Sequence, residues 1–382
     1  MRDSAEGKMD DAPTARTALI VGGGIGGMSL AICLARIGYS VDLVDIDPDW
    51  RAVGAGLTLN SASLRAFERV GLLDELRVAS DIHSGMMLYD VGGRLILDGS
   101  LDPGPRAEVG GILRPVLHRI MANAALASGT RVQLGQSVEA LDQSEKAVRV
   151  RFTDGKTGNY GLVIGADGVH SAVRKTIFPD APDPTFTGQG CWRAVFPRPA
   201  SVRTSELYLD SFHKAGLNPV SREEMYMFLL ESVPPSAKMP PERWRKLLRE
   251  RMKPFGGRIA ELRERLDENA RINYRPLEKL MLPPPWHIGR VLLIGDAVHA
   301  TTPHCAYGAG LAVEDAVVLA ELLADGMEIE AAMPRFVARR YERCRHVVEG
   351  SCLLGELEMS HAPVDEHRRV GNEMASFIAQ PI

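Results

Sequence analysis

The sequence predicts an α/β fold: a Rossmann-like dinucleotide-binding domain with an inserted, mostly antiparallel β-sheet and C-terminal helices. Three observations predict it. A glycine-rich strand–turn–helix unit lies near the start, a proline-rich stretch of short strand-like runs follows, and a second buried strand then leads into a glycine-rich helix start. We expect a flexible tail over 1–16, the dinucleotide-binding domain over 17–178 and 286–350, the inserted substrate-domain sheet and helix over 179–285, and a C-terminal helix and tail over 351–382.

Composition excludes several classes of protein. The 382 residues carry 45 basic and 49 acidic side chains, a net charge of −4, which argues against a nucleic-acid or membrane-surface partner. Five cysteines without a C-x-x-C pair indicate a reducing compartment and argue against a disulfide framework or a zinc site. No apolar run approaches the ~20 residues of a membrane span. We expect a cytoplasmic protein that holds no metal and is a monomer or a homodimer.

The first binding unit spans residues 18–45. After the apolar run Ala18–Val21, Gly22, Gly24 and Gly27 stand in G-x-G-x-x-G register. The first glycine permits a tight turn, the second lets a pyrophosphate approach the backbone, and the third lets helix and strand pack closely. The helix start adds free N–H groups and partial positive charge. Asp45 ends the next strand 21 residues after Gly24 (45 − 24), where an acid bonds a ribose hydroxyl.

The elements that follow alternate between helix and strand. Gly92-Gly93, between alternating apolar and polar residues, predicts a hairpin near 85–101, which we place in the dinucleotide-binding domain. A helix is expected from about Pro115. The apolar run Leu162–Ile164 predicts a buried strand that ends at Gly165-Ala166-Asp167-Gly168. Ser171 is then a candidate helix cap.

The inserted segment differs from the rest of the chain in its clustered prolines and short strand-like runs. Its β-branched and aromatic runs predict strands of an antiparallel sheet at Cys191–Phe196, Glu206–Leu209 and Met225–Leu230. A basic helix follows near 242–255, and we interpret its charged side as an ordinary solvated face.

The dinucleotide-binding domain resumes at a third strand-to-turn site. The buried strand Val291–Ile294 leads to Asp296, and Gly308 and Gly310 precede a helix expected over Leu311–Leu323. An acid leaving a strand, exposed backbone and a helix N-terminus form a further phosphate- or ring-binding surface. One NAD needs only one such unit, so three sites predict a larger cofactor.

Three fingerprints in this order resemble those of the single-component FAD-dependent aromatic hydroxylases, typified by para-hydroxybenzoate hydroxylase. They are GGGIGG (22–27), GADGVHSAVR (165–174) and GDAVHATTPHCAYGAG (295–310). The turn Ala55–Thr58 and the LRPVL helix start with Arg114 are also similar. The resemblance covers roughly residues 17 to 350, and the combination is far more specific than any one motif.

The resemblance implies bound FAD, NADH or NADPH as reductant, and O2. Gly22, Gly24 and Gly27 would hold the pyrophosphate, Asp45 the adenosine ribose and Asp296 the ribityl or pyrophosphate region. Thr58, Arg114 and the backbone of Val138 would be further cofactor contacts. The isoalloxazine ring would lie against Ala306, Gly308, Ala309 and Gly310. Asp167 matches an acid linked to both FAD and the nicotinamide, although a purely turn-forming aspartate is an equal alternative.

The implied reaction is hydroxylation of a small electron-rich aromatic or N-heterocyclic substrate, of phenol, hydroxybenzoate or hydroxypyridine type, through a flavin C4a-hydroperoxide. A helix N-terminus beside the ring stabilises the anionic reduced flavin, and the protein must exclude water and aim the substrate. Two functions remain as alternatives: an FAD-dependent reductase or dehydrogenase without oxygen insertion, and, ranked lower, a non-catalytic nucleotide-sensing protein.

Two strands in HKAGLNPVSREEMYMF (213–228) are predicted to form a hairpin of the inserted sheet, and the substrate residues are inferred from it. Lys214 and Tyr226 fall where relatives place a cation and a phenol near the substrate, so we assign them catalytic roles; the alternative for Lys214 is an exposed strand-edge lysine. His213 should point to the opposite strand face. His304 and Cys305 lie close to the flavin by sequence, but a packed histidine and a small apolar cysteine are the simpler interpretations.

Two positions depart from the family pattern. Tyr307 replaces a common glutamine, which could alter flavin mobility or the pocket wall. Asn60-Ser61-Ala62 stands where Pro-Asn is common.

Overall fold

Parallel strands form the central sheet of the protein. The computed structural model describes residues 16–52, 54–99, 108–234 and 239–382, so the predicted tail, Arg16 excepted, lies outside the described residues. The sheet has six strands in the order β18-β19-β12-β1-β2-β8. All neighbours are parallel except β18 and β19. The strands are β1 (Thr17–Val21), β2 (Ser40–Asp45), β8 (Arg131–Leu134), β12 (Leu162–Gly165), β18 (His287–Ile288) and β19 (Val291–Leu293).

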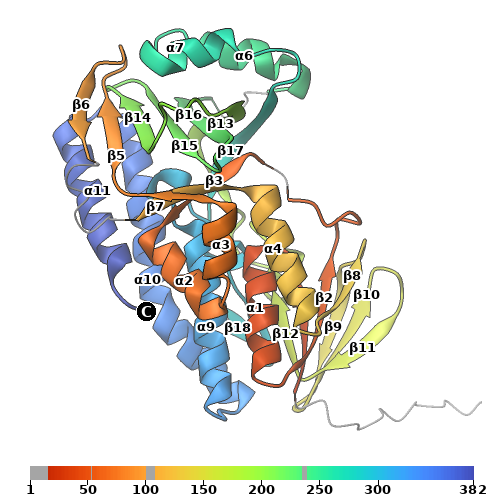
Figure 1. Cartoon of the computed structure of the whole chain (residues 1–382). Coiled ribbons are helices and arrows are strands. Elements are labelled where there is room, and N and C mark those ends of the chain that lie inside the picture. Colours follow the sequence, from red (N-terminus) through yellow and green to blue (C-terminus); the bar gives the residue numbers. More distant parts are fainter. Residues whose placement is uncertain (1–15, 53, 100–107, 235–238) are drawn as a thin grey trace, which may run out of the picture.

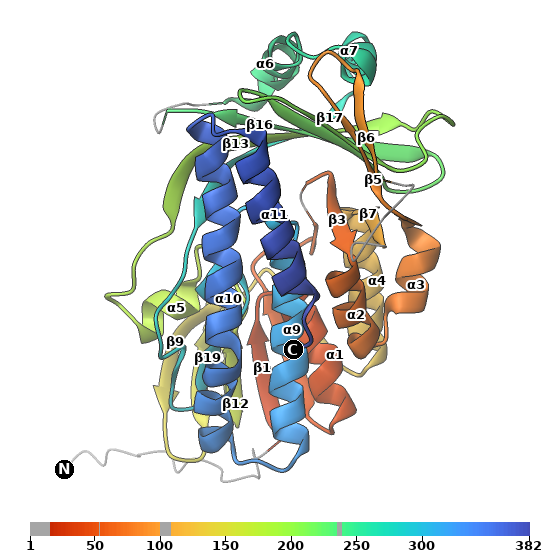
Figure 2. The same ribbon diagram turned by 90° about the vertical axis from the view of Figure 1, so that its left-hand side faces the viewer.

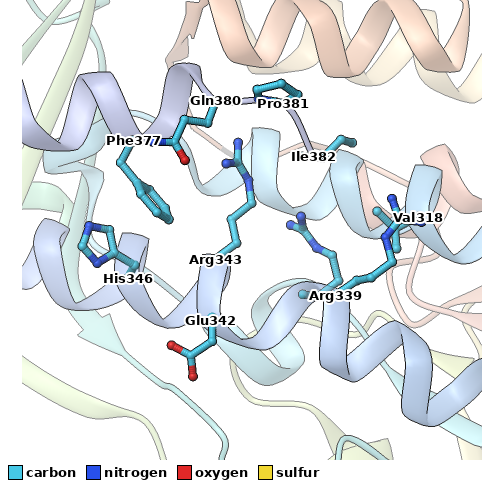
Figure 3. A pocket seen from close by; sticks show the side chains of 10 residues that line it. Val318, Arg339, Glu342, Arg343, His346, Phe377, Gln380, Pro381 and Ile382 are labelled. Atoms are coloured by element: carbon cyan, nitrogen blue, oxygen red, sulfur yellow. The ribbon is translucent and has the colours of Figure 1, made fainter.

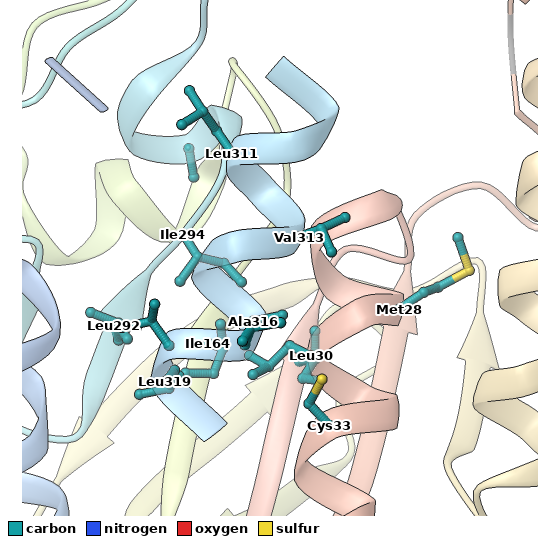
Figure 4. Close-up of a cluster of buried hydrophobic side chains, with 14 of the residues drawn as sticks. Met28, Leu30, Cys33, Ile164, Leu292, Ile294, Leu311, Val313, Ala316 and Leu319 are labelled. Atoms are coloured by element: carbon teal, nitrogen blue, oxygen red, sulfur yellow. The ribbon is translucent and has the colours of Figure 1, made fainter. Parts of the chain in front are cut away.

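Helices cover this sheet because its strands are apolar on both faces. The helices α1 (Ile25–Arg36) and α9 (Gly308–Ala324) pack against each other and the strands through fully buried aliphatic side chains (Figure 4). Leu30, Ile164, Leu292 and Leu319 are all inaccessible to solvent. The predicted helix over Leu311–Leu323 is confirmed and begins three residues earlier, at Gly308.

Smaller elements surround this core. Two three-stranded antiparallel sheets have the orders β11-β10-β9 and β3-β7-β4. Their strands are β3 (Gly56–Asn60), β4 (Asp81–His83), β7 (Val109–Leu113), β9 (Val138–Gln143), β10 (Val148–Phe152) and β11 (Thr157–Tyr160). The helices are α2 (Ser61–Val70), α3 (Leu73–Ala79), α4 (Arg114–Ala127), α5 (Ala172–Ile177) and α8 (Asp296–His299). Ser171 caps α5 as expected, and Asn60 caps α2.

The inserted sheet has seven strands in the order β17-β13-β16-β15-β14-β5-β6. They are β5 (Met86–Tyr89), β6 (Leu95–Asp98), β13 (Thr185–Pro197), β14 (Ser205–Leu209), β15 (Lys214–Pro219), β16 (Glu224–Ser232) and β17 (Arg271–Lys279). The β5–β6 hairpin forms as predicted, but its placement in the dinucleotide-binding domain was wrong. It extends the inserted sheet because β5 pairs in parallel with β14.

The two faces of the inserted sheet differ. Its outer face packs on α6 (Trp244–Arg251) and α7 (Gly257–Glu264), so that Trp192, Met227, Leu248 and Ile259 share a core of their own. These helices lie on the far side of the sheet from the rest of the molecule (Figure 1). Alternation along a strand sends every second residue to the inner face, toward the cofactor-binding half.

Two long helices close the chain. α10 (Ile329–Met359) and α11 (Val364–Ala379) run beside α9 up to the inserted sheet (Figure 2). The domain boundary that we expected between residues 350 and 351 does not occur, since α10 continues through these residues. Within the described residues, no helix has the length and apolarity that a membrane crossing requires.

Candidate cofactor and substrate site

Three turns meet at the carboxyl ends of β1, β12 and β19. The amide of Ala166 donates to Val21 O at 2.8 Å and that of Ile294 to Gly165 O at 3.0 Å. Gly22 has φ +108°, and a Cβ there would lie 2.3 Å from Ala166 O. This close approach is possible only for glycine. The three fingerprints therefore come together at one edge of the sheet, as open α/β sheets require of a ligand site.

Gly24 is where this edge leaves room for a ligand. A Cβ on Gly27 would lie 1.9 Å from Gly22 O, so that glycine serves helix packing. A Cβ on Gly24 would meet no atom within 4 Å, and the backbone there is extended, with φ −79° and ψ −172°. Gly24 is also the N-cap of α1 and is exposed. A pyrophosphate fits this position.

Asp45 and Asp167, the two predicted ligand-binding acids, also hold the local chain. Asp45 Oδ2 accepts from Gly23 N at 2.6 Å, and its other oxygen accepts from Asp47 N at 2.8 Å. Asp167 accepts from Ser171 Oγ at 2.5 Å and from the amides of Ala172 and Val173 at 2.7 and 3.0 Å. These contacts give Asp167 the turn-forming role; contacts of either acid with a cofactor stay predictions.

Arg114 and Asp296 face accessible space deep inside the protein. Both residues are exposed, yet the surrounding protein raises the pKa of Asp296 and lowers the pKa of Arg114. A solvent-exposed side chain on the outer surface would not be desolvated by the protein. A side chain that lines a water-accessible interior can be both exposed and desolvated. Both predicted cofactor contacts therefore lie where a large ligand can reach them.

Two buried polar atoms without a partner in the described chain lie near Asp45 and Gly310, which are predicted cofactor contacts. Gln136 Oε1 is buried without a partner in the described chain, and the backbone N–H of Gln136 donates to Asp45 O at 3.0 Å. Ser63 Oγ is likewise unpaired and would lie 2.9 Å from a Cβ on Gly310. Val138 follows Gln136 and is 8% exposed. Both atoms are closed to solvent, so neither faces the accessible side of Arg114 and Asp296, and a contact of Val138 with a cofactor stays a prediction.

Asp296→Ala is expected to weaken FAD binding, because an acceptor for a cofactor hydroxyl, shielded from solvent once FAD is bound, is lost at a cost of roughly 1–3 kcal/mol. Quenching of FAD fluorescence on titration of apoprotein measures the dissociation constant. The matched control is Asp365→Ala, in α11, whose side chain is 90% exposed. Equal affinity of Asp296→Ala and wild type would remove Asp296 from the cofactor site.

The loop before α9 leaves part of its backbone accessible to a ligand. Ala306 has φ +50°, and Gly308 and Ala309 are partly accessible. The 17-residue helix α9 begins at Gly308, so its positive end lies where anionic charge on a ring would be stabilised. Tyr307 is 1% exposed, its hydroxyl donates to Glu314, and its ring packs below Gly310. Tyr307 therefore anchors α9 in the core and does not form the pocket wall.

Tyr226 acts on Thr58. Its hydroxyl lies 2.9 Å from Thr58 Oγ1, and Asn218 Nδ2 donates to both oxygens, at 2.7 and 3.0 Å. Tyr226 is 3% exposed, whereas Thr58 is partly accessible. If Tyr226 donates to Thr58, the threonine hydroxyl proton remains available to a ligand. These bonds hold the phenol against Thr58, and a catalytic role of Tyr226 stays a prediction.

Lys214 and Tyr226 are not brought together. They share the inner face of the sheet, but Lys214 lies opposite Leu230 and Tyr226 opposite Asn218, four positions along the hairpin. Lys214 Nζ instead donates to Glu358 Oε1 at 2.5 Å. His213 bonds Asp210 and contacts Phe255 of the outer core, as expected for the opposite face. Convergence of the lysine and the phenol on one ring is therefore not supported.

Two arginines of the inner face were missed by the sequence analysis. Arg193 lies opposite Phe228 and Asn273, and Arg275 lies opposite Cys191, so the two arginines are diagonal neighbours. In the described part of the chain, neither makes a hydrogen bond or an ion pair. Both lie near enough to lower the pKa of Arg114. No sequence motif marks them, because only the strand register places them on this face.

A cavity also lies elsewhere in the described part of the chain. About 360 Å³ opens between α10, α11 and the C-terminal residues, lined by Arg339, Arg340, Arg343 and Phe377 among others (Figure 3). Its three arginines are already paired with Glu321, Glu314 and Asp315. Because these charges are neutralised within the chain, the three arginines offer no free cation to an anionic ligand.

Comparison with known proteins agrees with this geometry. The model of the FAD binding domain family matches residues 15–351. The aurachin C monooxygenase/isomerase of Stigmatella aurantiaca is 32% identical, over 90% of each chain. The 6-hydroxynicotinate 3-monooxygenase of Bordetella bronchiseptica is 28% identical, over 86% of this chain and 88% of that one. The crystal structure of Klebsiella pneumoniae HpxO with FAD and uric acid aligns with a TM-score of 0.84 at 24% identity, over 97% and 98% of the two chains. The chain belongs to the FAD-binding-domain family and is an FAD-dependent monooxygenase of the aromatic hydroxylase type.

Proposed function

We propose that this protein hydroxylates a small aromatic or N-heterocyclic substrate that carries an anionic group, using NADH or NADPH and O2. The substrate would lie between the inner face of the inserted sheet and the loop at Ala306–Gly310. FAD, when bound, supplies the electron transfer and the activation of oxygen. The chain supplies the binding, the orientation and the exclusion of water.

An excess of positive charge around the interior supports an anionic substrate. Arg193 and Arg275 both lower the pKa of Arg114, whereas Asp296 is the one carboxylate among the groups that raise it. Like charges gathered in a desolvated space are unfavourable unless an anion joins them. Planar guanidinium groups are suited to carboxylates. The relatives named for hydroxynicotinate and 3-hydroxybenzoate act on rings that carry a carboxylate.

The remaining inner-face groups have distinct roles in this proposal. Phe228 and Val195 provide the apolar wall that packs on a ring and excludes water. The Thr58 hydroxyl, held by Tyr226 and Asn218, donates a hydrogen bond at the other end of the space. Together they can fix the ring's orientation between a cationic and a neutral polar contact.

The test is a screen of hydroxylated aromatic acids, hydroxypyridine carboxylates and their uncharged amides for stimulated oxidation of NADH and NADPH. Product analysis with ¹⁸O2 should show one labelled oxygen in the product of an acid substrate. Oxidation that yields only peroxide, or reduced product without label, would favour the reductase alternative. Preference for the amides would refute the anionic class.

Arg193→Met and Arg275→Met are each expected to lower kcat/KM for the acid substrate by roughly ten- to a hundredfold, because one charge-assisted bond is worth about 1.5–3 kcal/mol. FAD content should not change. Arg271→Met, on the same strand as Arg275 but paired with Glu224 at the exposed end of the sheet, serves as the control. Unchanged kinetics in both test variants would place the anion elsewhere.

A further inference from the structure

A shielded charge cluster joins three parts of the chain beside this space. Glu358, near the end of α10, accepts from Lys214 of β15 at 2.5 Å. Its other oxygen accepts from His304 Nε2 and from Gln189 of β13, both at 3.1 Å. The His304 side chain is fully buried, and Glu358 is 13% exposed. One carboxylate thus links the inserted sheet, the C-terminal helix and the loop that leads to Ala306.

α10 holds the same loop at a second point. Ser351, two turns before Glu358 on the same helix side, donates to Thr302 O at 2.8 Å and accepts from Cys305 N at 3.3 Å. The loop is therefore fixed to α10 at Thr302, His304 and Cys305. From the inserted sheet, Lys214 and Gln189 reach the loop through Glu358, and Leu280, which follows β17, donates to Ala300 O at 3.0 Å.

The charge of Glu358 determines which ring nitrogen of His304 carries a proton. Burial raises the pKa of Glu358, but Lys214 and His304 outweigh burial and lower that pKa, so Glu358 is a carboxylate that can only accept. His304 Nε2 must therefore carry a proton. His304 Nδ1 lies 2.9 Å from Thr302 Oγ1. Since Ser351 uses its proton on Thr302 O, the Thr302 hydroxyl donates either to Ser351 or to His304 Nδ1.

We propose that Lys214, Glu358 and His304 are positioning residues. They hold the flavin-facing loop at Thr302–Ala306 in its binding position only when the inserted sheet is packed correctly against α10. The inference rests on the proposed function, since the substrate would lie between that sheet and that loop. Lys214 acts through Glu358 and does not touch the substrate. The cluster borders the substrate space, because Lys214, Leu230, Cys191 and Arg275 lie in one row across the inner face of the sheet. From α11, His367 also faces Glu358 and Lys214.

The first experiment measures coupling with the substrate found in the screen. Lys214→Met and Glu358→Gln should retain FAD and substrate KM, while product formed per NAD(P)H falls by about threefold or more and peroxide accounts for the rest. Lys214→Arg should restore coupling because it keeps the charge. The matched control is Lys279→Met, since Lys279 also pairs with α10, through Glu356, but at the exposed surface. Equal coupling in Lys214→Met and wild type would overturn the proposal, as would loss of FAD in Lys214→Met.

The second experiment needs no substrate. ¹⁵N spectra of histidine-labelled protein, with His304→Gln to identify the signal among ten histidines, should show His304 protonated at Nε2. That signal should move in Lys214→Met and stay in Lys214→Arg and Lys279→Met. A signal that Lys214→Met leaves in place would overturn the proposal even if no aromatic acid were turned over. If the signal moves and no substrate is found, the proposed function fails and the positioning role stands.

Discussion

Gly24→Val is expected to abolish FAD binding while leaving the protein folded. Valine tolerates the backbone at this position, which is extended and not left-handed, and its Cβ would meet no protein atom within 4 Å. The branched side chain would instead occupy the space for the pyrophosphate and cover the amide groups at the start of α1. The ratio of bound FAD to protein after purification and reconstitution measures the effect, and circular dichroism checks the fold.

Gly371 offers a matched control. It lies within helix α11, and a Cβ there would likewise meet nothing within 4 Å. Gly371→Val should therefore keep the FAD content of the wild type. Normal flavin in Gly24→Val would show that the phosphates bind away from the first turn, and loss of flavin in both variants would show a general effect of branched residues.

Arg340→Met is expected to destabilise the fold by about 3–5 kcal/mol, because it removes the cation that two buried carboxylates share. Arg340 is 1% exposed and donates to Asp315 Oδ1 and to Glu314 Oε2, both at 2.7 Å. Asp315 also accepts from His299 at 2.7 Å and from Gly295 N at 2.9 Å. The variant should unfold at lower urea concentration and release FAD more readily, since Gly295 precedes Asp296.

The comparison is with Arg345→Met on the same helix. Arg345 pairs with Glu342 and Glu349, but these side chains are 38, 69 and 58% exposed. Exposed pairs contribute about 0–1 kcal/mol. Urea midpoints that fall equally in the two variants would contradict the importance of burial at Arg340.

The cofactor half of the site could be predicted because its signals are local. The glycines near Gly24 and the acids at Asp167 and Asp296 each stand next to an apolar strand, and parallel strands bring their ends to one edge. The substrate half depends on pairing between distant segments. The β5–β6 hairpin was placed with the wrong sheet because its partner, β14, lies more than a hundred residues later.

The register of strand pairing in the inserted sheet explains the other differences between prediction and structure. The hairpin of β15 and β16 was expected, but only its pairing shows that Lys214 and Tyr226 are four positions apart. The same pairing reveals Arg193 and Arg275 as neighbours on the inner face. A one-residue shift would reverse every face, and a single sequence does not determine register to that accuracy.

The order of strands in the central sheet bears on how the chain folds as it is synthesised. β12 lies between β1 and β19, but β19 is translated 126 residues later (291 − 165). At about 5–20 residues per second, the nascent chain carries an open parallel edge at β12 for roughly 6–25 s. The inserted sheet, with its own core against α6 and α7, leaves the ribosome complete within that interval. Co-translational folding should therefore finish the inserted sheet first, and chaperone contact should concentrate on the unfinished cofactor half.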